Sequence, residues 1–204
     1  MRGCLTRLKV TAHLGVFKCS PVRCSLKRDP SGRACSATNP STRMTPQAQV
    51  IWAGLEFRKP ATLQLLEPLT SEELRWRPPS GANPIGWQVW HIAEVEDNWV
   101  RQLLLGEARS YPLGRSVREA APDQYPPKSA LLSYFHEVRE RSRARLEATT
   151  EEAFDHHVRD AHFGELTVRE VWGGVVTSFA WHAGQIALTV RLLRGGNPFQ
   201  RGAA

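Results

Sequence analysis

Signals for the start of an α-helix recur along residues 44–204 and constrain the fold more than any other feature. A side chain that accepts a hydrogen bond from the first helical turn, followed by proline or by glutamate three residues later, marks a helix N-terminus. Four such signals occur: Thr45-Pro46, Asn83-Pro84, Thr70 with Glu73, and Thr167 with Glu170. They predict that most of this segment is helical.

Apolar residues at helical spacing give the expected extents of four long helices. We expect them to run from Pro46 to about Leu66, from Pro84 to Gly106, from about Ser129 to about Leu146 and from Thr167 to about Arg194. Pro60 should kink or break the first helix, because proline removes a hydrogen bond and clashes with the preceding turn.

Shorter elements are expected between the long helices. Short capped turns should follow Thr70 and Thr149, the latter with Glu152, and residues 107–127 form a proline-rich connection. One short extended pair fits within residues 154–166, and no alternation of period two is long enough for a larger sheet. The predicted fold class is therefore all-α, a four-helix bundle over residues 44–204.

Residues 1–43 differ from the rest of the chain in composition. They hold nine basic residues against the single acid Asp29, a net charge of +8, and all four cysteines: Cys4, Cys19, Cys24 and Cys35. Three interpretations fit this composition: a disordered basic arm, an organellar transit-like segment, or an over-long gene start ahead of Met44. We favour the last.

The domain after this segment is nearly neutral, with a net charge of −1 and no cysteine. A neutral domain lacks the electrostatic footprint for a polyanion, so we expect no nucleic-acid partner for the folded part. No run of 18 apolar residues occurs, so no membrane partner is expected either. The absence of cysteine in the domain fits a reducing, cytoplasmic location.

The last predicted helix carries polar residues on its apolar face. At about 100° per residue, Val175 and Ile186 fall within about 40° of His182, so His182 should lie in the middle of the core-facing stripe. Three further polar residues share that stripe: Ser178, Gln185 and Thr189. Buried polar groups need partners, so this stripe predicts a small polar pocket.

A second histidine, His91, lies on the flank of the apolar stripe of the helix that begins at Pro84. Two imidazoles on facing helices can bind a metal, transfer protons, or form hydrogen bonds within the core, and spacing alone leaves these three roles open. His136 is expected on the solvent side, whereas His162 could fold over the pocket. The charged run from Arg139 to Arg145 predicts an exposed face.

Two segments resemble the DinB-like family of damage-inducible bacterial proteins. The first reads Asn-Pro-Ile-Gly-Trp-Gln-Val-Trp-His-Ile-Ala over residues 83–93 and continues to Glu96-Asp97. The second begins at Leu166-Thr167 and includes His182-Ala-Gly-Gln-Ile over residues 182–186. The likeness extends over about residues 47–195 and implies a four-helix bundle, often a homodimer.

The resemblance also implies a divalent metal, Zn or Ni, held by three histidines. The first matches His91 and the last matches His182, while the middle one falls on Ser178, whose hydroxyl is a poor ligand for these metals. Ser178 and Gln185 are then expected to line the pocket as cofactor-binding residues. Characterised relatives use low-molecular-weight thiols.

Two hypotheses for function follow from this resemblance. The first is a divalent-metal-dependent S-transferase, or a related detoxification enzyme, that uses a low-molecular-weight thiol. The second is a non-catalytic, metal-free bundle that binds a small ligand or serves as a dimeric stress-response protein. Ser178 is the feature that favours the second.

Overall fold

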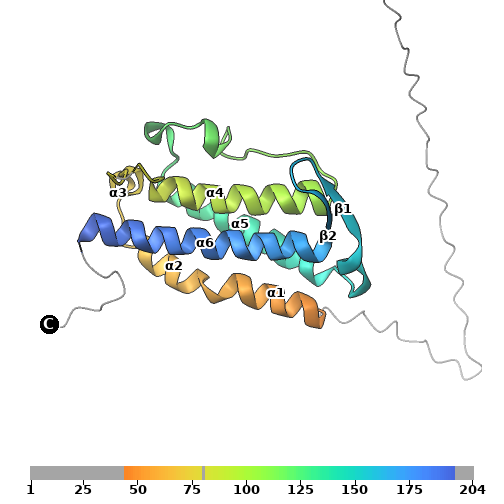
Figure 1. The fold of residues 1–204 in the computed structure, drawn as a ribbon. Helices are drawn as coiled ribbons and strands as arrows, with labels where there is room; N and C mark the ends of the chain where they lie inside the picture. The colour runs from red at the N-terminus through yellow and green to blue at the C-terminus, as the bar shows by residue number, and fades with distance from the viewer. Residues whose placement is uncertain (1–43, 80, 196–204) are drawn as a thin grey trace, which may run out of the picture. The chain divides into compact units, whose positions relative to one another are not determined.

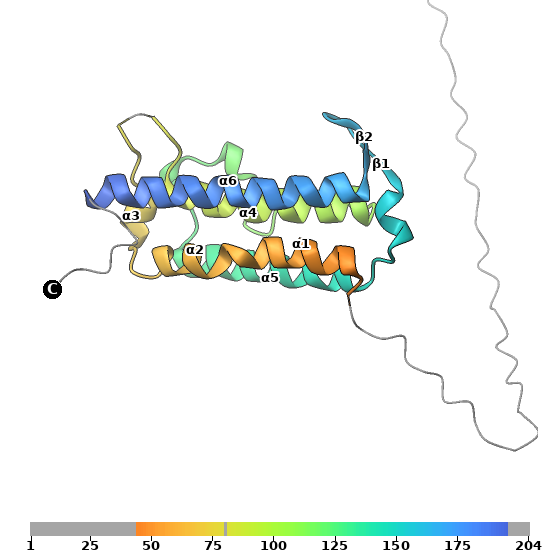
Figure 2. The same ribbon diagram turned by 60° about the horizontal axis from the view of Figure 1, so that its bottom comes forward.

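The computed structural model describes residues 44–79 and 81–195, which form one helical unit. The expected basic extension, residues 1–43, lies outside the described residues. The longer helices lie side by side: α1 followed by α2, then α4, α5 and α6, each called a rod below (Figures 1 and 2). The helices are α1 (Pro46–Phe57), α2 (Lys59–Leu66), α3 (Ser71–Arg75), α4 (Ile85–Asn98), α5 (Lys128–Glu147) and α6 (Val168–Arg194).

Short elements complete the chain. A π-helical turn, η1, continues α4, and three 3₁₀ turns and a two-stranded hairpin connect the longer helices: η1 (Trp99–Leu104), η2 (Val117–Glu119), η3 (Pro122–Gln124), η4 (Glu152–Asp155), β1 (His157–Asp160) and β2 (Gly164–Thr167). The strands pair antiparallel with His157 opposite Thr167. The expected extended pair within residues 154–166 is therefore confirmed, although its second strand ends one residue later, at Thr167.

Three of the predicted helix starts are confirmed and one is wrong. Thr45, Thr70 and Thr167 each accept a hydrogen bond from the first turn of the following helix. At α4, however, Pro84 is the residue before the helix and no side chain caps it. Asn83 contributes its backbone instead, because its carbonyl accepts a hydrogen bond from Gln88 Nε2.

The expected turn after Thr149 is also corrected. The hydroxyl of Thr149 donates to the carbonyl of Arg145, so it closes α5 rather than opening a new turn. The hydroxyl oxygen of the neighbouring Thr150 instead accepts a hydrogen bond from the backbone N–H of Ala153, which lies in η4. A threonine hydroxyl can donate to the backbone carbonyl four residues earlier in a helix. A hydroxyl used in this way is less available to cap the start of the next helical turn.

Proline divides the first rod as expected. α1 ends at Phe57 and α2 begins at Lys59, with Pro60 in its first turn, where the missing N–H costs no hydrogen bond. The rod that contains α4 continues as η1 to Leu104, and Gly106 follows with a φ of 67°. That conformation favours glycine, which explains why the helical stretch ends there.

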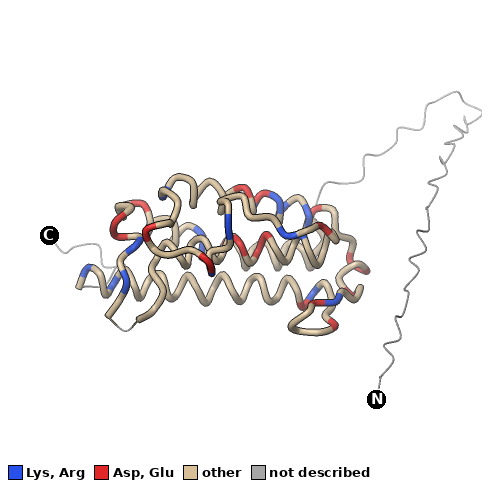
Figure 3. The backbone as a smooth tube through the Cα atoms, turned by 90° about the horizontal axis from the view of Figure 1, so that it is seen from above, with Lys and Arg blue, Asp and Glu red and all other residues tan. Residues whose placement is uncertain are grey.

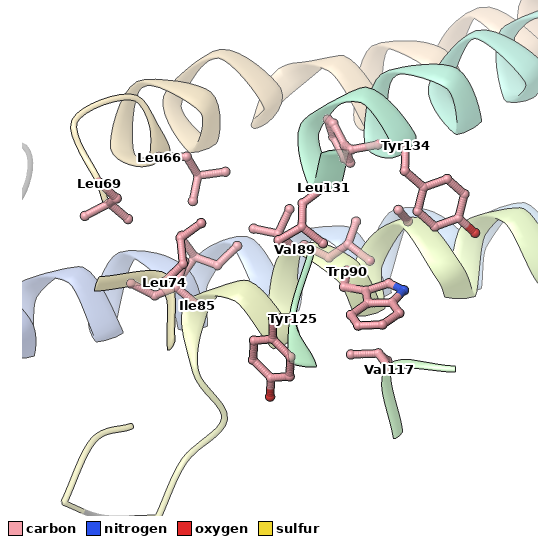
Figure 4. Close-up of a cluster of buried hydrophobic side chains, with 14 of the residues drawn as sticks. Leu66, Leu69, Leu74, Ile85, Val89, Trp90, Val117, Tyr125, Leu131 and Tyr134 are labelled. Atoms are coloured by element: carbon pink, nitrogen blue, oxygen red, sulfur yellow. The ribbon is translucent and has the colours of Figure 1, made fainter. Parts of the chain in front are cut away.

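The core has two clusters of buried apolar side chains. One lies among α2, α3, α4, α5 and α6 and includes Trp90 and Tyr125, shown in Figure 4. The other lies among α1, η1, η4 and α6 and includes Trp172 and Phe154. Each of the four rods contributes to both clusters, including α5 through Leu131 and Leu146, so the rods are held together along their length.

Arg139 corrects the prediction of an exposed charged face on α5. Its side chain is fully buried, with Nη2 3.1 Å from Glu96 Oε2 on α4. The guanidinium also lies over the rings of Phe179 and Phe135, at 4.7 and 5.2 Å from their centroids. Ser142 donates to the same glutamate at 2.6 Å. The Glu96–Arg139 pair is thus part of the core.

A second buried carboxylate lies beside the first. Asp97 accepts hydrogen bonds from Tyr134 and Arg141 on α5, and from Arg101 in η1. Part of the expected surface run on α5 therefore serves to pair with α4, because buried carboxylates need cationic or hydrogen-bonding partners.

The long helix α6 differs from α5 in charge. No charged residue occurs between Val171 and Val190, and Figure 3 shows charges only near its two ends. Trp181 and Leu188 are nevertheless exposed. No helix within residues 44–79 or 81–195 is long and apolar enough to cross a membrane.

Two adjacent glycines of α6 should respond oppositely to alanine. A Cβ on Gly174 would overlap the indole of Trp99, whereas a Cβ on Gly173 meets nothing within 4 Å. We expect Gly174→Ala to lower the free energy of unfolding by about 1–3 kcal/mol through overpacking. Gly173→Ala should raise it by about 0.5–1 kcal/mol through helix propensity. Urea unfolding of both variants tests this, and equal effects would contradict it.

The buried ion pair gives a second prediction. Arg139→Ala leaves Glu96 buried without its cation and should lower the free energy of unfolding by about 3–5 kcal/mol. Arg143, which is exposed and pairs with Glu147 one turn away, is the matched control. Arg143→Ala should cost less than about 1 kcal/mol. A cost for Arg139→Ala no larger than for the control would refute the structural role.

Candidate functional site

The predicted pair His91 and His182 is brought together between α4 and α6. The two ring centroids are 4.8 Å apart and the ring planes are inclined by 78°. The helices α4 and α6 are neighbours in both views of the fold (Figures 1 and 2). Residues 91 positions apart in the chain therefore form one polar site.

His91 is the more buried of the two, with 9% of its surface exposed. The indole of Trp87, one turn earlier on α4, stacks on it with a centroid separation of 4.4 Å and an angle of 19°. Its Nδ1 is buried and has no hydrogen-bond partner among the described residues. Such an unpaired nitrogen costs about 1–3 kcal/mol, so the imidazole is poised for a ligand.

His182 is half-buried, which corrects its expected place at the centre of the core-facing stripe. The buried side chains of Phe179, Ile186 and Val190 are about 40–80° further around α6. The core face is thus rotated away from the histidine. His182 lies at the edge of the core, where a ligand can reach it.

Gln185 determines the tautomer of His182. Its Oε1 is 3.0 Å from His182 Nδ1. Because an amide oxygen accepts but cannot donate, Nδ1 carries the proton and the lone pair is on Nε2. Outer-shell hydrogen bonds of this kind orient metal-binding histidines.

The other polar residues of α6 have different environments. Ser178 is half-buried one turn before His182, with no hydrogen-bond partner in the described part of the chain. Thr189 is buried; its hydroxyl donates to the Gln185 carbonyl and lies 3.4 Å from Gln88 Nε2. Thr189 is therefore part of the α4–α6 packing, whereas Ser178 and Gln185 remain beside the histidines.

Both histidines favour the neutral form. Burial is the main cause that lowers the pKa of His91 to about 4, followed by electrostatic interaction with the neighbouring His182 and with the charged Arg118. Burial also lowers the pKa of His182, although its hydrogen bond to Gln185 opposes this. Both imidazoles are therefore neutral near pH 7 and offer a lone pair to an electrophile or a metal.

A turn of the proline-rich connection is fixed next to His91. Glu94, one turn along α4, accepts hydrogen bonds from Ser116 Oγ at 2.6 Å and Val117 N at 2.8 Å. Arg118 follows and is exposed. The sequence did not predict that Arg118 lies near this site. Arg118 belongs to a long irregular connection, and such a segment has no periodicity that shows which helix it packs against.

The other histidines of the described residues take no part in this pair. His136 is exposed on α5, as predicted. His162 is exposed at the tip of the hairpin, and its ring contacts Phe163. Within residues 44–79 and 81–195, no group of three His, Cys, Asp or Glu side chains is placed to hold a metal ion.

The lowered pKa of His91 predicts a pH-dependent stability. Between the ordinary value of 6.5 and about 4, the unfolded chain binds a proton that the folded chain does not, so stability falls as pH falls. From about pH 7 to about pH 5 this histidine should contribute a loss of about 2 kcal/mol. His91→Gln should lose correspondingly less in urea unfolding, and the exposed control His136→Gln should behave like wild type. Equal pH dependence in all three proteins would exclude this effect.

Comparisons with known proteins agree with this architecture. The chain is similar to the crystal structure of a conserved protein from Enterococcus faecalis, with a TM-score of 0.61 and 17% identity over 72% of this chain and 97% of that chain. No functionally curated protein matches it. The sequence model of the DinB superfamily matches residues 55–186, which include both histidines and most of the helical unit. The chain therefore belongs to the DinB superfamily.

Proposed function

We propose that His91 and His182 hold a divalent transition metal, Zn or Ni, in an S-transferase or related detoxification enzyme that uses a low-molecular-weight thiol. The observation that carries this proposal is the hydrogen bond between His182 Nδ1 and Gln185 Oε1. It presents the Nε2 lone pair of His182 beside a second neutral imidazole.

The donor set fits such a metal in part. Neutral imidazole suits Zn, Ni, Cu and Fe, and the unpaired Nδ1 of His91 shows that this ring lacks a partner in the described chain. The hydroxyl of Ser178 is a poor third ligand. Two protein ligands leave more than one position for small molecules, which suits an exogenous thiol and also implies weak metal affinity.

The residues of this chain have separate roles in that reaction. His91 and His182 would supply the two nitrogens, Gln185 orients His182, and Trp87 holds the His91 ring by stacking. A metal held there would supply Lewis acidity, which would lower the pKa of the thiol cofactor towards neutral pH. Burial keeps both imidazoles neutral, so neither proton competes for the lone pairs.

A second candidate is a metal-free bundle that binds a small ligand. The observation that favours it is the lack of a third ligating side chain among the described residues. In that case the paired imidazoles and Gln185 would serve as hydrogen-bonding groups. The cytoplasmic location, the homodimer and the stress-response role stay predictions from the sequence.

Metal binding is tested by calorimetric titration of the full chain with Zn²⁺ or Ni²⁺. Wild type should bind weakly, and His182→Ala should abolish binding. Ser178→His places a third imidazole one turn from His182, on the same helix face. It should tighten binding at least about tenfold, or about 1.4 kcal/mol, and the melting temperature should rise with metal.

His136→Ala is the matched control, because His136 is exposed and distant in sequence from both histidines. It should bind metal as wild type does. If neither wild type nor Ser178→His binds metal, the transferase hypothesis is wrong and the metal-free bundle replaces it.

A further inference from the structure

We propose that Arg118 recognises an anionic group, such as a carboxylate, on the small molecule that binds beside His91 and His182. This inference rests on the proposed function in that it concerns the ligand of the same site. It names the chemical class of that ligand, which neither the fold nor the histidine pair determines.

The first argument is how firmly the Arg118 backbone is held. Both carboxylate oxygens of Glu94 accept hydrogen bonds from the turn before Arg118, one from Ser116 Oγ and one from Val117 N. Ser116 Oγ also accepts from Arg118 N at 3.3 Å. Hydrogen bonds to a charged group contribute about 1.5–3 kcal/mol each, so the turn is well fixed to α4.

The second argument is where the turn lies along α4. The side chain of Val117 is buried in the first core cluster and lies beside Trp90 (Figure 4). Glu94, which lies one helical turn after Trp90 on α4, binds the same loop segment through Ser116 and Val117. The interval from Trp90 to Glu94 includes His91, so the residue after Val117 is anchored at the level of the histidine.

The third argument is charge. Arg118 is exposed and forms no ion pair among the described residues, although Glu119 follows it directly. After burial and the neighbouring His182, the charge of Arg118 also lowers the pKa of His91, so the guanidinium is close enough to act on this imidazole. The carboxylate of Glu94 is already committed to Ser116 and Val117.

These features together describe a site for an amphipathic anion. The guanidinium is planar and donates two parallel hydrogen bonds to a carboxylate. His91 supplies a nine-tenths buried imidazole whose Nδ1 has no partner in the described chain. A small molecule could place a hydrogen-bond donor or a sulfur atom beside the imidazoles and its anionic end beside Arg118. Both the imidazoles and the guanidinium would then have a partner.

The test uses two thiols of equal shape and different charge, 3-mercaptopropionate and 3-mercaptopropionamide. Each is titrated into the full chain, without metal and with Zn²⁺, and binding is followed by NMR shifts of the His91 and His182 imidazoles. Wild type should bind the acid more tightly than the amide by roughly fivefold, or about 1 kcal/mol. Arg118→Gln should remove this preference without changing affinity for the amide.

Two variants serve as matched controls. Arg118→Lys keeps the charge and should keep most of the preference. Arg115→Gln removes another exposed arginine of the same connection, one that donates to Gln124, and should have no effect. Glu94→Gln weakens the anchor and should reduce the preference for the acid while the amide still binds, which a general loss of stability would not produce.

The outcomes separate this inference from the proposed function. Three results would overturn the role of Arg118. Wild type could bind acid and amide equally, or show no measurable binding of the acid at millimolar concentration. Arg118→Gln could also weaken the binding of both thiols equally. A preference for the acid that persists without metal, in a protein that binds no Zn²⁺, supports Arg118 and refutes the metal-dependent transferase.

Discussion

The burial of α4 on nearly every side is the constraint on which the rest of the structure depends. Twelve of its fourteen residues are buried, and several of these are charged or polar. A buried polar group must find a partner or destabilise the fold, and the partners come from different elements. Glu94 pairs with the 116–117 turn, Glu96 and Asp97 pair with α5, and Gln88 pairs with α6.

His91 has no such pairing: its buried Nδ1 has no partner within the described residues, and single side-chain oxygens of Gln88 and Asn98 are also unpaired. At the interface with α6, helix α4 thus leaves one imidazole without a hydrogen-bond partner among the described residues. Unpaired buried groups of this kind concentrate at functional sites, where binding of a ligand compensates their cost. The stability of α4 and the chemistry of the site are therefore properties of the same helix surface.

The sequence predicted the helices well because caps and apolar spacing act locally. Thr167 with Glu170 began α6 as expected, and Pro60 divided the first rod. The histidine pair was also predictable, from helix spacing together with the family resemblance. Arg139 was misjudged because a basic run looks solvent-exposed until the opposing Glu96 is known. Arg118 was missed for a similar reason: its place depends on Glu94, through a connection without periodicity.

The two imidazoles come from separate helices, and this has a mechanical consequence. Their separation is determined by the spacing of α4 and α6, and that spacing depends on the apolar residues between them. Val89 and Ile92 of α4 and Ile186 of α6 line a small cavity in the core, together with residues of α2 and α5. A change of side-chain volume there would alter the distance between the two imidazoles without any substitution of either histidine. Core residues can therefore tune which ion or ligand the pair accepts, so relatives with identical site residues could differ in selectivity through their cores alone.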